Sequence, residues 1–209
     1  MSRRAIRAHY EPRIARHREN YKILDWASPA TQRARFQVLT DNVPLGGKSL
    51  LDVGCGLGDL WAHLCHRGIE ARYTGVDILD AMVRQAQRQH PGVHFVHADI
   101  FESNPFGPRA FDVVFASGIF NLNLGNNLAF LPVALGRMFE IVREHVVFNL
   151  LHVRSAGINR QYAFYDPQAV LEILRPFPCE VRLVDDYLAN DFTVICRLAE
   201  GTPELPPRK

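Results

Sequence analysis

A glycine-rich turn within residues 49–59 constrains the fold of this chain more than any other stretch. An apolar run that carries Asp52 near its end precedes the turn, and a helical pattern begins at Leu60. The three glycines between them alternate along the chain: Gly54, Gly56 and Gly58. This order predicts a buried strand, a tight turn and the start of a helix. Because glycine lacks a Cβ atom and a helix start presents unpaired N–H groups, we expect a nucleotide-like ligand against this backbone.

The spacing of the glycines argues against two common nucleotide sites. A dinucleotide-binding turn reads Gly-x-Gly-x-x-Gly/Ala, and Asp59 occupies the position of its third small residue. A carboxylate there would face the pyrophosphate, which is unfavourable. No Lys-Ser/Thr pair follows, which excludes a phosphate-binding P-loop. A tight turn that binds no ligand remains the alternative for this motif taken alone.

Three further apolar runs predict strands, and two of them end in an acid. Residues 72–79 contain Asp77, which lies about 20 residues past the turn, where a ribose-binding carboxylate is expected. Residues 94–101 contain Asp99, and the run 111–117 leads directly into Gly118. Acids at three successive strand ends after a glycine turn are a far more specific signal than any one of them. They predict a ligand site along one edge of a sheet.

These motifs resemble those of the class I S-adenosylmethionine (AdoMet) methyltransferases, over about residues 45–200. The resemblance implies an α/β fold with a doubly wound, seven-stranded, mostly parallel sheet of order 3-2-1-4-5-7-6, an antiparallel last strand and helices on both faces. It implies that Asp52 helps to hold the amino-acid end of AdoMet, Asp77 the ribose hydroxyls and Asp99 the adenine amino group, and that S-adenosylhomocysteine is the product. The full implied cofactor set is Trp26, Arg35, Asp52, Gly54, Cys55, Gly56, Gly58, Asp77, Ile78, Asp99, Ile100, Ser117 and Gly118.

Residues 1–44 are expected to form an N-terminal helical cap or arm. The first 24 residues are rich in arginine and carry apolar residues at three- and four-residue steps. This pattern predicts an amphipathic helix that starts or is interrupted at Pro12. Such an arm could bind an anionic substrate such as RNA, or it could be a solvated helix that covers the cofactor cleft.

A second cap helix is predicted from Pro29 through Thr40, with Ser28 as its N-cap. The segment resembles the cap of small-molecule methyltransferases, in which an arginine can pair with the AdoMet carboxylate. Arg35 is the candidate for that pairing, and Trp26 is a candidate to shield the cofactor. Ordinary packing or exposure is the alternative for both residues.

The rest of the pattern completes one domain over residues 45–200. Helices are expected at 60–67, 80–90, 126–142 and 167–174, a fifth strand at 144–151, and a terminal hairpin of strands 180–187 and 191–198. Leu128 is among the apolar residues expected to face the core. The long loop 152–165 follows the carboxyl end of a strand, where open α/β sheets bind ligands. The tail 201–209 is proline-rich and charged and is expected to be flexible.

Composition limits the compartment and the partners. With 209 residues, 47% of them apolar, the chain can bury one substantial core, and a net charge of +2 is too small to require a polyanionic partner. The four cysteines lack the spacing of a zinc site and are expected to be reduced, partly buried thiols. We recognise no signal peptide and no membrane-spanning run, and therefore expect a cytoplasmic protein that holds no metal.

Four residues near the predicted strand ends are candidates for the chemistry of methyl transfer: Asn121, His152, Tyr162 and Tyr165. His152 is the best general base by the usual pKa of its side chain. The Asp/Asn-Pro-Pro-Tyr signature of nucleobase-amine methyltransferases is missing, because the segment 117–120 reads Ser-Gly-Ile-Phe. The predicted function is methyl transfer from AdoMet to an oxygen or nitrogen of a small molecule.

Alternatives remain for both function and partners. One is an RNA methyltransferase that uses the basic arm, and another is a non-catalytic AdoMet-binding protein; a nicotinamide oxidoreductase is disfavoured by Asp59. Segments 26–28, 116–122, 165–167 and 186–194 together look like those of a bacterial group of methyltransferases whose substrate is unassigned. The pattern predicts no oligomeric state.

Overall fold

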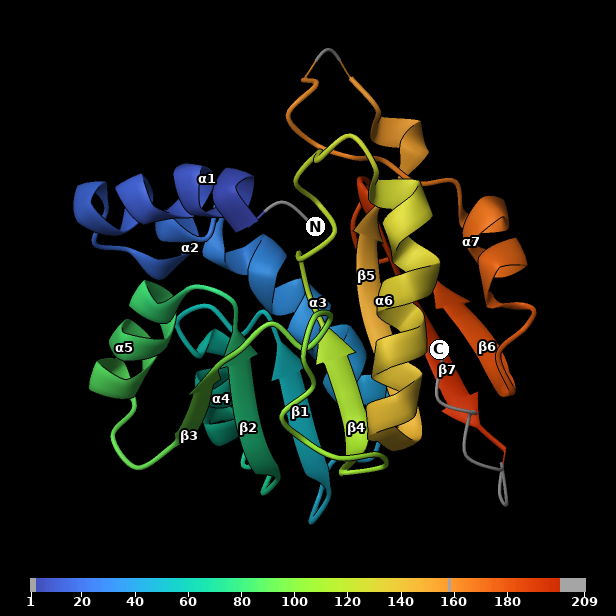
Figure 1. Ribbon diagram of the computed structural model, residues 1–209, viewed down its shortest axis with the longest axis horizontal. Coiled ribbons are helices and arrows are strands. Elements are labelled where there is room, and N and C mark those ends of the chain that lie inside the picture. Colours follow the sequence, from blue (N-terminus) through green and yellow to red (C-terminus); the bar gives the residue numbers. More distant parts are fainter. Residues whose placement is uncertain (1–2, 158, 200–209) are drawn as a thin grey trace.

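A computed structural model describes residues 3–157 and 159–199 of the chain (Figure 1). Within them, one sheet contains β1 (Ser49–Val53), β2 (Arg72–Asp77), β3 (His94–His97), β4 (Phe111–Ala116), β5 (Val142–Leu151), β6 (Cys179–Val184) and β7 (Asp191–Leu198). The helices are α1 (Arg3–Arg16), α2 (Asn20–Ile23), α3 (Pro29–Asn42), α4 (Asp59–His66), α5 (Asp80–Gln89), α6 (Asn127–Ile141) and α7 (Pro167–Leu174), with a short 3-10 turn at Val153–Ser155. The predicted tail 201–209 lies outside the described residues.

The sheet confirms the predicted topology. Its seven strands follow the order β3-β2-β1-β4-β5-β7-β6; β7 pairs antiparallel with both β5 and β6, and the other pairs among the described strands are parallel. Every residue of β1 and β4 is buried, as expected for central strands that are covered on both faces. The chain order changes direction at β1, which lies between β2 and β4. A crevice at the carboxyl ends of these strands is where such sheets bind ligands.

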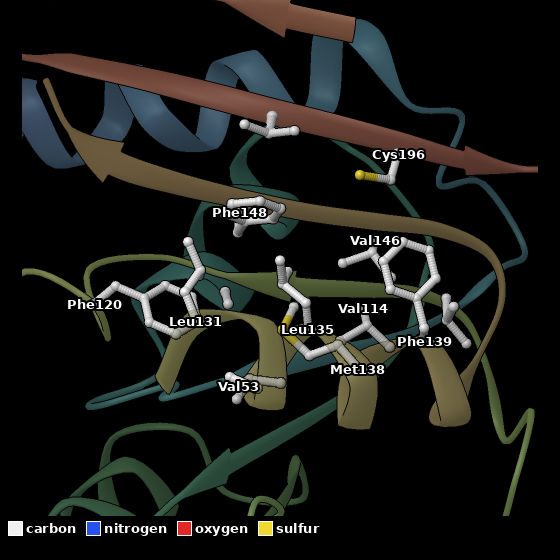
Figure 2. Packing of buried hydrophobic residues seen from close by; sticks show 14 of the residues in the cluster. Val53, Val114, Phe120, Leu131, Leu135, Met138, Phe139, Val146, Phe148 and Cys196 are labelled. Atoms are coloured by element: carbon white, nitrogen blue, oxygen red, sulfur yellow. The ribbon is translucent and has the colours of Figure 1, made fainter. Parts of the chain in front are cut away.

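Helices form a layer on each face of the sheet. In Figure 1, α6 and α7 lie on one face, and side chains of α3, α4 and α5 form a second core on the other. Leu131, Leu135 and Met138 recur at helical spacing, so they share the side of α6 that packs on Val114 of β4 and Phe148 of β5 (Figure 2). Burial of these two apolar layers holds the strand ends, and therefore the ligand site, in fixed positions.

Three expectations about local structure need correction. Helix α1 continues through Pro12, at the cost of one backbone hydrogen bond. Leu128 lies in the first turn of α6 and is 55% exposed, because Leu131 and Leu135 occupy the core-facing side. The strand predicted at 180–187 ends at Val184.

The side chain of Arg154 accounts for the early end of β6. The guanidinium of Arg154 donates hydrogen bonds to the backbone carbonyls of Asp185, Leu188 and Ala189, at 2.6, 3.3 and 2.8 Å. Those carbonyl groups are therefore satisfied by a side chain from the loop after β5. The segment between β6 and β7 forms a wider turn than the three-residue connection that was predicted.

Candidate active site

The glycine turn after β1 adopts the conformation that its composition requires. Gly54, Gly56 and Gly58 have φ values of +74°, +53° and +82°, in the left-handed region that favours glycine. A Cβ atom on Gly56 would lie 2.6 Å from Cδ2 of Leu24, which belongs to the cap. Glycine is therefore required at position 56 partly because a side chain of the protein itself lies against the turn, in addition to any ligand that binds there.

A cavity opens at the carboxyl ends of β1, β2 and β4, beneath α1. Its empty volume is about 1310 Å³, counting the part that is open to solvent. Eleven of the predicted cofactor residues line it: Trp26, Asp52, Gly54, Cys55, Gly56, Asp77, Ile78, Asp99, Ile100, Ser117 and Gly118. Gly58 does not line the cavity. It precedes α4, where an added Cβ would lie 2.8 Å from the rings of Phe95 and His90.

Two buried carboxylates in this cavity, those of Asp52 and Asp77, form no ion pair in the described part of the chain. Asp77 accepts backbone hydrogen bonds from Gly56 and Leu79, at 3.0 and 2.8 Å, and burial raises its pKa. Asp52 accepts a hydrogen bond from the hydroxyl of Tyr73 at 2.7 Å, and burial raises its pKa to about 7. A ligand that supplies hydroxyl or ammonium donors would satisfy both carboxylates.

The third predicted acid, Asp99, contacts the cap. Nε of Arg3 donates to its Oδ2 at 3.2 Å, and the backbone N–H of Phe101 donates to its Oδ1 at 3.0 Å. Helix α1 also places Ile6 and Tyr10 in the cavity wall. Burial raises the pKa of Tyr10 to about 12, with a further contribution from the charge of Asp77, so its hydroxyl stays protonated near neutral pH. Thus the basic arm covers the cavity in this structure.

Trp26 and Arg35 lie together, but only Trp26 reaches the cavity. A Cβ on Gly118 would lie 2.7 Å from the indole ring of Trp26, so the ring lies directly on this glycine. The guanidinium of Arg35 is 4.5 Å from the centroid of that ring and donates from Nε to Oδ2 of Asp191 at 2.9 Å. The guanidinium of Arg35 thus pairs with the carboxylate of the fully buried Asp191. The structure therefore does not place Arg35 in the cavity, where it was predicted to pair with the cofactor carboxylate.

The candidates for catalysis divide into two pairs. Asn121 and Tyr162 line the cavity, whereas His152 and Tyr165 do not. Nδ1 of His152 accepts the backbone N–H of Arg154 at 3.0 Å, which caps the 3-10 turn, and its ring packs on Phe192. The buried hydroxyl of Tyr165 donates to the backbone carbonyl of Phe120 at 2.9 Å. Both residues have structural partners and lie outside the cavity, so the structure does not bring them together with Asn121 and Tyr162; their catalytic role stays a prediction.

Sequence reasoning did not identify Asp25 as part of the site. Asp25 lines the cavity with a left-handed backbone (φ 62°), which is uncommon for a residue other than glycine. Its carboxylate accepts the hydroxyl of Tyr162 at 2.8 Å, contacts Nε2 of His9 at 3.0 Å, and pairs with Arg13. The positive φ could not be read from the sequence, and the partners lie in two segments separated by more than 130 residues.

Gln32 and Asp59 also line the cavity. Nε2 of Gln32 donates to Oδ2 of Asp59 at 2.8 Å, and Nδ2 of Asn20 donates to Oδ1 at 2.6 Å. The carboxylate of Asp59 is thus held by amides of the cap. Asp59, whose carboxylate would be unfavourable beside the pyrophosphate of a dinucleotide, therefore lies in the wall of the cavity.

Within residues 3–157 and 159–199, no cluster of three or more His, Cys, Asp or Glu side chains is arranged to hold a metal ion. No helix in these ranges has the length and apolar character needed to cross a membrane.

Comparisons with known proteins agree with this geometry. The family described as "Methyltransferase domain" matches residues 50–144. Trans-aconitate 2-methyltransferase of Rhodopseudomonas palustris is 40% identical over 201 residues, covering 82% of this chain and 78% of that protein.

Two solved structures share the fold at low sequence identity. Magnesium protoporphyrin IX methyltransferase of Synechocystis PCC 6803, with bound S-adenosylhomocysteine, gives a TM-score of 0.69 at 14% identity and covers 95% of this chain and 100% of that one. A Burkholderia thailandensis 1,6-didemethyltoxoflavin-N1-methyltransferase, with the same product bound, gives 0.67 at 19% identity and covers 95% of this chain and 87% of that one.

Proposed function

The chain belongs to the class I AdoMet-dependent methyltransferases, and from that premise we propose that it transfers a methyl group to an oxygen or nitrogen atom of a small-molecule acceptor. The observation that carries the proposal is one cavity at the strand ends. It brings the three acids of the glycine-turn pattern together with two neutral polar groups, Asn121 and Tyr162. The relatives and neighbours described above carry small-molecule substrates in their names, which supports the same class of acceptor.

The cofactor would be held by the buried acids. Asp77 would accept the ribose hydroxyls, since two backbone N–H groups already hold its carboxylate in one orientation. Asp52 would accept the ammonium group of the amino-acid end, and a cation there would favour the ionised carboxylate. Asp99 would accept the adenine amino group after Arg3 moves aside, with Ile78 and Ile100 against the ring.

AdoMet supplies a methyl group activated by a positively charged sulfur. In the transfer, a lone pair of the acceptor forms the new bond to carbon as the carbon–sulfur bond breaks with its electrons staying on sulfur, and the acceptor releases a proton. The protein contributes alignment and exclusion of water. Because His152 lies outside the cavity, the pair formed by Tyr162 and Asp25 is the better candidate to receive that proton.

Two parts of the chain would divide this work. We assign the cover of the cavity to residues 1–44 and cofactor binding to residues 45–200. Arg3, Arg7 and Arg13 of the arm each pair with a carboxylate of the chain itself, which leaves less of the arm's positive charge for an RNA substrate. The four cysteines are free, as in proteins of the reducing cytoplasm, which we propose as the location.

The direct test is incubation with AdoMet labelled in its methyl group and a fractionated cell extract. We expect label in a small organic product that is soluble after protein and nucleic acid have been removed. Asp77→Ala serves as the control that lacks cofactor binding. Label that is found only in RNA, or binding of AdoMet without any labelled product, would contradict the proposal.

A further inference from the structure

A short ribbon forms the part of the cavity wall that lies beyond β4. An isolated bridge joins Leu122 to Tyr162, and the N–H of Ala163 donates to the carbonyl of Asn121 at 2.8 Å. The ribbon thereby fixes the loop after β5 against the segment after β4. Five of its side chains line the cavity and are called the acceptor wall here: Ile119, Asn121, Leu122, Leu124 and Tyr162.

The charged groups that line the cavity have one sign. Its carboxylates are Asp25, Asp52, Asp59, Asp77 and Asp99, and the described lining includes no Lys, Arg or His. Three arginines that contact lining residues are already paired: Arg13 with Asp25, Arg3 with Asp99, and Arg35 with Asp191. A carboxylate or phosphate group on an acceptor would lose its hydration here and gain no cationic partner from the protein.

Two oxygens of the acceptor wall, one from Asn121 and one from Tyr162, can accept hydrogen bonds from a ligand. Oδ1 of Asn121 is buried and has no donor among the described residues. The hydroxyl hydrogen of Tyr162 is donated to Oδ2 of Asp25, which leaves the lone pairs of its oxygen for a ligand. A molecule that reaches either atom must therefore bring an O–H or N–H group, which an ionised carboxylate lacks.

We propose that the methyl acceptor is an uncharged or cationic molecule with an apolar body, whose hydroxyl or amine donates to the acceptor wall at Asn121 or Tyr162. The apolar body would contact Ile119, Leu122 and Leu124. This inference rests on the proposed function and narrows it. It separates this chain from the relative named for trans-aconitate, since aconitate carries three carboxylates and the cavity described here offers no cation for any of them.

The test uses the full-length protein and compares two arginine substitutions. Leu124→Arg adds a cation to the acceptor wall, whereas Leu128→Arg adds the same charge at a position that is 55% exposed and outside the cavity. For each protein we would measure the affinity for S-adenosylhomocysteine and the methyl transfer to the extract pool. Products labelled by the unaltered protein are then separated by charge on ion exchangers at pH 7.

We expect the labelled product in the neutral or cationic fraction. Leu124→Arg should lower the transfer at least tenfold, with the affinity for S-adenosylhomocysteine within about twofold, and Leu128→Arg should match the unaltered protein. A labelled product that is retained on the anion exchanger, or transfer that is unchanged or increased in Leu124→Arg, would overturn the inference.

A separate arm keeps this inference distinct from the proposed function. The protein saturated with S-adenosylhomocysteine is incubated with the same metabolite pool, and retained compounds are recovered by ultrafiltration and sorted by charge. Retention of neutral or cationic compounds without methyl transfer would contradict the proposed enzymatic activity but not the proposed acceptor class. Retention of carboxylates or phosphates, or of no compound at all, would contradict the acceptor class.

Discussion

The two ends of the sheet hold buried aspartates in opposite circumstances. At the amino end, Asp112 of β4 accepts hydrogen bonds from the backbone N–H and the hydroxyl of Ser49, both at 2.7 Å, and from Nε of Arg143 at 2.7 Å. Burial alone would raise the pKa of Asp112, but Arg143 and Ser49 hold it well below its usual range. At the carboxyl end, burial raises the pKa values of Asp52 and Asp77, and neither forms an ion pair in the described residues; at Asp77 the charge of His97 offsets only part of the shift.

This difference separates a structural acid from acids that are suited to a ligand. The hydrogen bonds and charge of Asp112 are completed by the fold itself, which joins the starts of β1, β4 and β5. Asp52 and Asp77 line a cavity, so a ligand can supply the donors that the protein does not. A buried carboxylate without a cation costs stability, and such costs are typical of binding and catalytic sites.

The largest effect is expected at Asp77. We predict that Asp77→Ala weakens binding of S-adenosylhomocysteine at least about 100-fold, since loss of charge-assisted hydrogen bonds to two hydroxyls costs about 3 kcal/mol or more. Titration calorimetry measures the change. An affinity within a few-fold of that of the unaltered protein would show that Asp77 does not bind the cofactor. The proposed difference between the aspartates at the two ends of the sheet would then be wrong.

Asp112→Asn is expected to show the reverse pattern. It should lower the free energy of unfolding by about 2 kcal/mol, because Arg143 and Ser49 lose a buried ionised partner. Because the pKa of Asp112 is lowered in the folded protein, its stabilisation is present above the unfolded pKa of about 4 and is lost as the pH falls. Urea denaturation at pH 7 and pH 3 should thus show a smaller difference at pH 3. A changed ligand affinity at pH 7 would contradict the structural role.

The pKa of Asp52 predicts a pH dependence of ligand binding. With a pKa of about 7, its carboxylate is mostly ionised at pH 8 and mostly protonated at pH 6. If the ionised form binds the ammonium group, the affinity for S-adenosylhomocysteine should fall about tenfold from pH 8 to pH 6. Asp52→Asn should bind weakly and lose this dependence. The same slope in the variant would assign the titration to another group.

The smallest effect is expected at Arg3. Its side chain is 54% exposed, and it pairs with Asp99 and with Glu102 at the surface. Exposed ion pairs contribute little, so Arg3→Ala should change the affinity for S-adenosylhomocysteine by about twofold or less. A tenfold change in either direction would show that closure of α1 controls the site. Calorimetry under the same buffer conditions makes this comparison with Asp77→Ala direct.

Much of the fold could be predicted because its signals are local. The glycine turn, the acids after β2 and β3, and the apolar runs each specify structure within a few residues. The start of α3 is an example, since Ser28 forms the predicted N-cap by accepting the N–H of Thr31 at 3.2 Å. The helix predicted at 167–174 likewise begins at a local signal, since the carboxylate of Asp166 accepts the N–H of Gln168 at the start of α7.

The place of Arg35 could not be predicted, because it depends on a distant partner. Arg35 pairs with Asp191, which lies 156 residues further along the chain. His152 follows β5 as predicted; its ring caps the turn that comes next and packs on Phe192 of β7, a contact that only the folded chain makes. Asp25 was missed for the same reason, since His9, Arg13 and Tyr162 meet it only in the folded protein.

A crystal structure with S-adenosylhomocysteine at saturating concentration tests the central claim most directly. We predict the ribose hydroxyls within hydrogen-bond distance of the Asp77 carboxylate, about 2.7 Å away, and the amino group close to Asp52. The adenine should lie between Ile78 and Ile100. A nucleoside bound with its ribose away from Asp77, or a cavity without ligand at saturation, would contradict the account.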